Sequence, residues 1–170
     1  MAVHDEQGIS ATSVRDIAKR AGVAPSTVLH HFPQMDELIR ACGELSEHLL
    51  PMPSEAILAG TSGAFERISR MAQAMFEWWE GMGPGFDHLR IDRRRIPEVE
   101  AWMVDVARRH RAFAAAALGA VDDRRVALLV ALTSADAWWA LAAAAADPAA
   151  AAVEVATVLV RPEPSKETVH

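Results

Sequence analysis

The sequence predicts an all-α fold, and three observations support this prediction. Half of the 170 residues (51%) are hydrophobic, so the chain can bury a sizeable core. Long segments rich in Ala, Leu, Val, Met and Arg contain few Pro or Gly residues. Between these segments the sequence lacks the alternation of apolar and polar residues that is typical of β-strands.

The cysteine content and the first residues indicate where the protein works. Cys42 is the one cysteine, so no disulfide can form within the chain and no zinc site of cysteine spacing can be built. The start, MAVHDEQG, carries acidic side chains and lacks the apolar segment of a secretory signal. We therefore expect a cytoplasmic protein.

Local signals place the first helix over residues 13–21. Thr12 or Ser13 is its N-cap, and Asp16 stands where it completes a capping box. Gly22 follows the last turn, where a left-handed backbone costs glycine little. The helix is therefore expected to end at residue 21.

A second and a third helix follow. Pro25 suits the first turn of a helix that reaches about His31, and Pro33 prevents its continuation. The third helix begins within 34–36 and runs to Leu50. One stripe of this helix is apolar and consists of Leu38, Cys42, Leu45 and Leu49.

The first two helices have the layout of a helix-turn-helix, in which two short helices are joined by a turn that contains glycine. Small or apolar residues occupy the positions where the helices must cross and the turn must close. These residues are Ile17, Ala18, Ala21, Val23 and Val28.

The segment TSVRDIAKRAGVAPSTVLHHFPQMDELI resembles the DNA-binding helix-turn-helix of the TetR family of transcriptional regulators. The resemblance covers Gly8 to about Ala41, and it is strongest in VRDIAKRAGV, at Thr27, and in HHFP followed by an acidic pair and LI. The rest of the chain resembles the family only in layout, as an all-helical ligand-binding and dimerisation domain. The resemblance implies a homodimeric repressor that binds a palindromic operator in double-stranded DNA and is released when a small molecule binds its core.

The resemblance also implies which residues contact DNA. In this family the helix that begins here at Pro25 enters the major groove, where its first residues reach base edges and flanking groups hold phosphates. Lys19 and Arg20 add positive charge or are only solvated. The implied DNA-binding residues are Thr12, Ser13, Arg15, Pro25, Ser26, Thr27 and His30.

The two adjacent histidines do not form a metal site. Neighbouring residues of a helix point about 100° apart, so His30 and His31 cannot both ligate one metal ion. Neither has a nucleophile or a Glu-x-x-His partner nearby. By the family pattern His30 faces DNA and His31 faces the domain interior. The sequence therefore predicts no catalytic residue, no metal and no cofactor.

Three departures from the family pattern favour a second hypothesis. Many members have Tyr in place of Leu29 and Lys in place of Met35, and both of those side chains hold phosphate. The first fifty residues hold four Lys or Arg and seven Asp or Glu, a net charge of −3 that opposes phosphate binding. Seven residues precede Gly8, about two helical turns, so we expect an incomplete first helix. The chain then either begins downstream of its natural start or has an incomplete domain. The alternative to a repressor is a dimeric small-molecule-binding protein that has lost DNA binding.

A second domain is expected over residues 54–160, between a DNA-binding domain over 1–50 and a flexible tail over 161–170. A helical stripe between residues 68 and 82 is rich in Met and Trp, which suit either a core or an adaptable ligand pocket. Both interpretations stay open. The predicted ligand is a small apolar or amphipathic molecule. The predicted ligand-binding residues are Met71, Met75, Trp78, Trp79, Met82, Phe86, Trp102, Met103 and Phe113.

The middle of this domain contains a linker, an arginine cluster and a helix. Residues 81–89 are predicted to be a turn-rich linker. The arginines of RIDRRR, residues 90–95, are explained by a solvated charge run or, alternatively, by an anion site. An amphipathic helix then begins at Pro97.

The segment 126–146 is long and apolar enough to span a bilayer. Asp136 lies within it, and a central Asp costs about 2.5–3.5 kcal/mol in a membrane. We therefore predict no membrane span and a buried helical hairpin over 122–160. Such an apolar hairpin favours an interface, and the resemblance implies a four-helix bundle between two subunits. Trp138 and Trp139 divide between interface and core, in either order. The predicted interface residues are Leu128, Leu132, Ala135, Trp138, Trp139, Val153 and Val160.

An α-helical enzyme is the third hypothesis. The sequence offers no convincing pair of acids, no nucleophile with its base and no metal-ligand spacing. We therefore predict no enzymatic activity.

Overall fold

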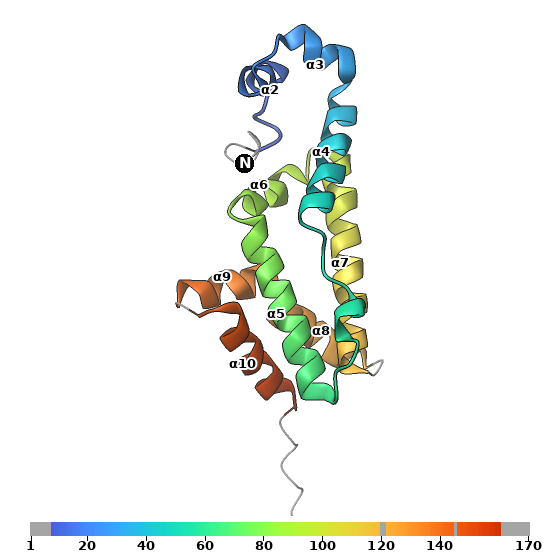
Figure 1. Cartoon of the computed structure of the whole chain (residues 1–170), viewed down its shortest axis with the longest axis vertical. Helices are drawn as coiled ribbons and strands as arrows, with labels where there is room; N and C mark the ends of the chain where they lie inside the picture. Colours follow the sequence, from blue (N-terminus) through green and yellow to red (C-terminus); the bar gives the residue numbers. More distant parts are fainter. Residues whose placement is uncertain (1–7, 120–121, 145, 161–170) are drawn as a thin grey trace, which may run out of the picture. The chain divides into compact units, whose positions relative to one another are not determined.

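The computed structural model describes residues 8–119, 122–144 and 146–160, and every regular element within these ranges is a helix (Figure 1). The predicted all-α class is confirmed. The helices in chain order are α2 (Val14–Ala21), α3 (Pro25–His31), α4 (Met35–Leu49), the 3₁₀ turn η1 (Glu55–Leu58), α5 (Ala64–Met82), α6 (Gly85–Asp92), α7 (Pro97–Leu118), α8 (Asp123–Leu132), α9 (Ala135–Ala143) and α10 (Pro148–Val160).

The chain forms two compact units that are not consecutive in sequence. The first unit contains the described residues up to Met52 together with Gly81–Arg108, and the second contains Pro53–Glu80 and the described residues from Arg109 onward. The predicted boundary near Ser54 lies close to the first change of unit. Residues 81–108, which we expected in the second domain, belong to the first unit instead. The expected tail over 161–170 lies outside the described residues.

The core of the first unit joins its first three described helices. Ala18, Val28 and Leu38 are buried, and partly buried apolar side chains from the same helices pack around them. The predicted apolar stripe of α4 holds only in its first turns, because Leu45 and Leu49 are 57% and 72% exposed. The packing cluster ends at Cys42, so the later turns of α4 lie beyond the reach of α2 and α3.

A helix replaces most of the predicted linker over 81–89. Gly83 has a φ of 61°, and the chain re-enters a helix directly after Pro84. Phe86 and Asp92 of α6 are buried, so tertiary packing stabilises a segment whose glycines indicated only turns.

An ion pair closes the corner between α6 and α7. The Arg93 guanidinium donates to both oxygens of Glu100, at 2.5 and 2.9 Å, and this hydrogen bond lowers the pKa of Glu100. Arg94 and Arg95 are exposed. The arginine cluster is therefore partly an intramolecular ion pair, in addition to the solvated charge that we predicted.

The second unit is built around α5, whose buried face contains the predicted Met and Trp stripe. The Phe76 and Trp138 rings are stacked with centroids 5.2 Å apart, which fixes α9 against α5. The side chain of Arg67 donates to the carbonyl of Ala117 on α7 at 3.0 Å. Arg125 of α8 donates to the carbonyl of Leu159 on α10 at 2.9 Å. Specific contacts thus link α5 to α7 and α9, and α8 to α10.

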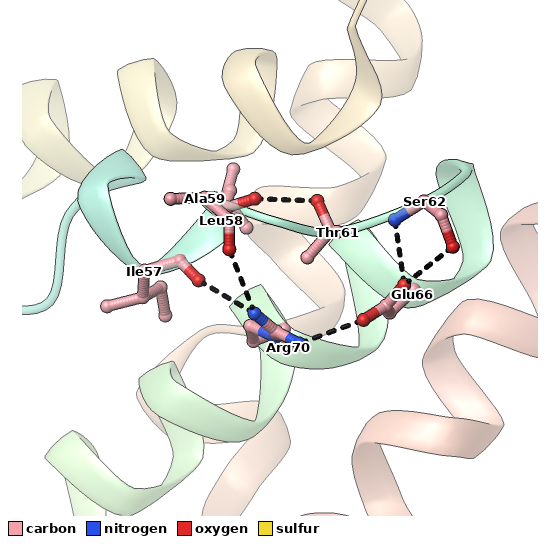
Figure 2. A network of polar contacts seen from close by, with 7 residues as sticks. All are labelled: Ile57, Leu58, Ala59, Thr61, Ser62, Glu66 and Arg70. Atoms are coloured by element: carbon pink, nitrogen blue, oxygen red, sulfur yellow. Dashed lines mark hydrogen bonds and ion pairs between the residues drawn. The ribbon is translucent and has the colours of Figure 1, made fainter.

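The segment before α5 is held by a polar network (Figure 2). Arg70 donates to the carbonyls of Ile57 and Ala59, both at 3.3 Å, and to Glu66 at 2.8 Å. Glu66 accepts in turn from the backbone N–H of Ser62 at 2.8 Å. This network anchors η1 and its following turn to the first two turns of α5.

The predicted two-helix hairpin over 122–160 is wrong in detail, because three helices occupy these residues. The break falls at Thr133 and Ser134, where the Ser134 hydroxyl accepts from the Ala137 N–H and caps α9. Within the described residues no single helix is long and apolar enough to cross a membrane. α8 and α9 together reach the necessary length and composition, but they are bent by 43° at the break.

Two glycines in open space give a matched test of the backbone argument. Gly22 has a φ of 69°, whereas Gly43 lies inside α4, and an added methyl group meets nothing within 4 Å at either site. We expect Gly22→Ala to destabilise the protein by about 1 kcal/mol, because the left-handed region disfavours a Cβ atom. We expect Gly43→Ala to stabilise it by roughly 0.5–1 kcal/mol through helix propensity. Chemical denaturation measures both, and equal signs for the two variants contradict this account.

Candidate functional site

The start of α2 is fixed by a capping box. The Ser13 hydroxyl accepts from the Asp16 N–H at 3.2 Å, while Asp16 accepts from the Ser13 N–H at 3.0 Å and from its hydroxyl at 2.5 Å. These hydrogen bonds lower the pKa of Asp16. The Thr12 hydroxyl donates to the carbonyl of Gly8 at 2.7 Å. Both hydroxyls that we predicted to bind phosphate therefore already have an acceptor within the chain.

The turn between α2 and α3 satisfies the backbone at the end of α2. The N–H groups of Gly22 and Val23 donate to the carbonyls of Lys19 and Ala18, at 3.3 and 3.0 Å. This is the Schellman arrangement, which needs the left-handed φ of Gly22. The chain leaves the turn extended and starts α3 at Pro25. α3 therefore begins at a fixed point relative to α2.

α3 directs one side chain inward and most of the others outward. Val28 is buried against Ala18, while the residues at the start of the helix are exposed. An N-terminal turn with exposed side chains is what a helix needs to reach base edges in a major groove. The residues on this surface that we predicted to contact base edges or the DNA backbone are all exposed. They are Pro25, Ser26, Thr27 and His30.

Both histidines of α3 are exposed, so the prediction that His31 faces the interior is wrong. Their ring centroids are 5.5 Å apart with an interplanar angle of 72°. Val28 and Phe32 occupy the inner face instead. Among the described residues, no group of three or more His, Cys, Asp or Glu could hold a metal ion.

The surface around α3 carries few positive charges. Arg15 and Lys19 of α2 are exposed. The two substituted positions also lie on the surface, with Leu29 48% and Met35 40% exposed. Apolar side chains are thus present where the family resemblance implies phosphate-binding groups.

Residues 1–42 match the family model of bacterial regulatory proteins of the tetR family. This match identifies residues 1–42 as a TetR-type DNA-binding domain. No curated protein and no solved structure is significantly similar to the chain. The family identification therefore depends on the DNA-binding domain, whose described part has the α2–α3 geometry above. The expectation of an incomplete first helix concerns residues 1–7, which lie outside the described residues.

The predicted ligand-binding residues do not all fall in one unit. Six are buried: Met71, Met75, Trp78, Trp79, Phe86 and Phe113. The other three, Met82, Trp102 and Met103, are partly buried. The second unit contains Met71, Met75, Trp78, Trp79 and Phe113, and the first unit contains the remaining four.

Sequence reasoning missed a buried polar centre at the break between α8 and α9. The indole N–H of Trp79 donates to the Thr133 carbonyl at 2.9 Å. The Thr133 hydroxyl donates to the Leu129 carbonyl at 2.7 Å and lies 2.8 Å from His110 Nε2. Because the hydroxyl has one proton and directs it at Leu129, His110 Nε2 must be the donor to Thr133. The threonine and serine inside an apolar run were the available signal.

Two further buried side-chain atoms have no hydrogen-bond partner among the described residues. They are Ser69 Oγ and the indole nitrogen of Trp138. Trp138 is only 1% exposed. A buried N–H without an acceptor is unfavourable by about 1–3 kcal/mol, so an interior donor of this kind requires an explanation.

The predicted interface residues divide between surface and core. Leu128 and Val153 are 47% and 49% exposed, and Val158, which was not predicted, is 63% exposed. Leu132, Trp139 and Val160 are partly buried. Ala135 and Trp138 are buried within the chain itself, where Trp138 stacks on Phe76, so they do not lie on a surface that a second subunit can cover.

His110 makes the stability of the second unit depend on pH. Burial lowers the pKa of His110 to about 4 from its ordinary 6.5. The unfolded chain therefore binds the proton first, and the contribution of His110 is complete above pH 6.5 and is lost as the pH falls toward 4. We expect this loss to reach about 3 kcal/mol.

Denaturation of the wild type and His110→Gln between pH 4 and 7 measures this contribution. Glutamine retains an N–H donor but does not titrate in this range. The wild type should lose more stability than the variant, and parallel curves would show that His110 contributes nothing.

Proposed function

We propose that this chain is a dimeric TetR-type repressor that reads a palindromic operator through α3 and leaves it when a small molecule binds. The observation that carries this proposal is the packing of α2 on α3. Ala18 and Val28 are buried between the helices, while Pro25, Ser26 and Thr27 are exposed at the start of α3. This arrangement supports major-groove reading by the first turn of α3.

Phosphate binding in this proposal depends on α2. Arg15 and Lys19 are exposed there, and Arg20 adds a third positive charge. The hydroxyls of Thr12 and Ser13 already donate to Gly8 and Asp16, so they contact DNA only if they exchange these acceptors for a phosphate. The basic side chains therefore contribute most of the electrostatic affinity.

The proposed ligand is small, apolar or amphipathic, and carries a hydrogen-bond acceptor. Two observations in the second unit support this class: the aromatic side chains of Phe76 and Trp138 pack in its interior, and the Trp138 indole N–H has no acceptor among the described residues. A ligand oxygen beside this nitrogen would remove the cost of the unpaired donor. Release from DNA then requires that the ligand bind one conformation of the dimer more tightly than the other.

The proposed dimer forms through α8 and α10. These helices contact each other, and Leu128, Val153 and Val158 lie exposed on them. Pairing with the same two helices of a second copy would bury these side chains in a symmetric interface. We propose a cytoplasmic location, since such a regulator acts on chromosomal DNA, and we assign it no enzymatic activity.

The second candidate function is ligand binding without DNA binding. It is favoured by the occupied hydroxyls at the start of α2 and by the apolar Leu29 and Met35 on the surface. Salt-dependent binding to DNA separates the two candidates, because phosphate contacts release counterions and ligand binding in an apolar core does not.

Fluorescence anisotropy with duplex DNA from the protein's own promoter region tests the repressor proposal. We expect wild-type binding to weaken as salt rises, and we expect Arg15→Ala to reduce the salt slope by about 1. Arg108→Ala, which removes a charge from α7 at a side chain that is 69% exposed, is the matched control and should leave the slope unchanged. A wild type that does not bind at low salt would support the ligand-binding candidate instead.

Sedimentation velocity tests the dimer. We expect Val158→Glu to shift the protein toward monomer, because each interface would then bury two unpaired carboxylates. Phe65→Glu introduces the same charge at an exposed apolar position of α5, 42% exposed, and should leave the dimer intact. Equal behaviour of both variants would contradict an interface on α10.

A further inference from the structure

A buried carboxylate joins α6 to the segment that leads into α2. Asp92, the last residue of α6, is 4% exposed. Its Oδ2 accepts from the N–H groups of Ile9 and Ser10, at 2.6 and 3.2 Å. Its Oδ1 accepts from the Ser10 hydroxyl. We name these contacts the Asp92 clasp. They connect residues more than eighty positions apart, and all of them lie within the first unit.

The backbone of Gly8 makes the close approach possible. Gly8 is buried with a φ of 84°, and a Cβ atom there would lie 3.2 Å from Asp92 Oδ2 and 3.5 Å from His88 Cβ. A larger residue would therefore be strained and would crowd the carboxylate. The Gly8 carbonyl also accepts from the Thr12 hydroxyl at 2.7 Å. Hydrogen bonds thus fix the chain from the clasp to the N-cap of α2.

The other side of Asp92 is equally fixed. Its backbone carbonyl accepts from the N–H groups of Arg95 and Ile96, at 2.8 and 3.0 Å, at the corner between α6 and α7. The bidentate pair of Arg93 and Glu100 closes the same corner. Asp92 therefore cannot follow the segment before α2 without disturbing α6 and α7.

We propose that Asp92 is a positioning residue for DNA reading, which holds the start of α2 at one place on α6. The inference rests on the proposed DNA-binding function. Arg15 lies one residue into α2, so an error in the placement of that helix start moves its guanidinium away from a phosphate. The clasp supplies three hydrogen bonds to one carboxylate, which is stronger than neutral hydrogen bonding and specific in direction.

A positioning role for Asp92 predicts a different effect on DNA binding from a purely structural role. A variant that only destabilises the fold lowers the fraction of active protein, but the folded molecules keep the wild-type affinity and salt slope. A variant that misplaces α2 lowers the affinity of folded molecules and loses phosphate contacts, so its salt slope becomes shallower.

The experiment compares Asp92→Ala with Asp87→Ala, in anisotropy titrations against the promoter duplex at several salt concentrations. Asp87 is the matched control, because it is an exposed carboxylate on the same helix, paired only loosely with Arg90 at 3.7 Å. Active fractions are measured by stoichiometric titration. We expect Asp92→Ala to raise Kd about tenfold and to reduce the salt slope by about 1, with Asp87→Ala unchanged.

Two further variants complete the test. Asp92→Asn keeps an oxygen for the N–H groups and can donate its amide to the Ser10 hydroxyl, so it should restore binding to within about threefold of wild type. Ser10→Ala removes one donor and keeps both backbone bonds. It should raise Kd less than Asp92→Ala, and it serves as the test variant if Asp92→Ala does not fold. Amide exchange at Ile9 and Ser10 should accelerate in Asp92→Ala and not in Asp87→Ala.

The outcomes separate this inference from the proposed function. A wild type that does not bind DNA overturns the proposed function and the positioning role together. Wild-type binding with an unchanged Kd and slope in Asp92→Ala overturns the positioning role alone. If Asp92→Ala does not fold, an unchanged Kd and salt slope in Ser10→Ala overturn the positioning role alone.

Discussion

The presentation of α3 depends on one close contact, the packing of Ala18 against Val28. Ala18 is completely buried, and a larger side chain there would push the two helices apart. The contact exists only because Gly22 reverses the chain in the left-handed region and satisfies the end of α2. With Val28 held inward, the first turn of α3 must face outward. The surface proposed to read DNA is thus a consequence of packing and turn geometry.

A different constraint applies to the second unit, because polar groups inside its apolar core need hydrogen-bond partners. Thr133 ends α8. Its hydroxyl pairs with His110 of α7 and its carbonyl accepts from Trp79 of α5, so the residue at the break also forms hydrogen bonds with two other helices. Trp138, one helix further, has no such partner for its indole N–H. The polar groups of Thr133 are hydrogen-bonded and therefore structural. The indole N–H of Trp138 lacks an acceptor and is therefore a candidate ligand contact.

Sequence reasoning succeeded where the signal is local and failed where it is not. Ser13, Gly22 and Pro25 act on their immediate neighbours, and the structure confirms the helix boundaries that they predicted. The glycines around Pro84 indicated a linker, but burial of Phe86 stabilises a helix there. Sequence cannot show that Asp92 meets Ser10, because no periodicity connects residues so far apart. The same limit applies to Trp138. The next residue, Trp139, is also a tryptophan, but it is only partly buried.

The charge of the DNA-binding domain constrains how it can read an operator. With a net charge of −3 over its first fifty residues, the domain gains little from long-range attraction to DNA. In the proposed repressor, affinity then comes from a few basic side chains held in register with phosphates, and each of them contributes only if the helix start is placed correctly. A domain with many phosphate contacts tolerates an error of placement, because other contacts remain. The proposed interface has few, so the positioning role that we propose for the hydrogen bonds at the start of α2 gives them a larger share in binding than their number suggests.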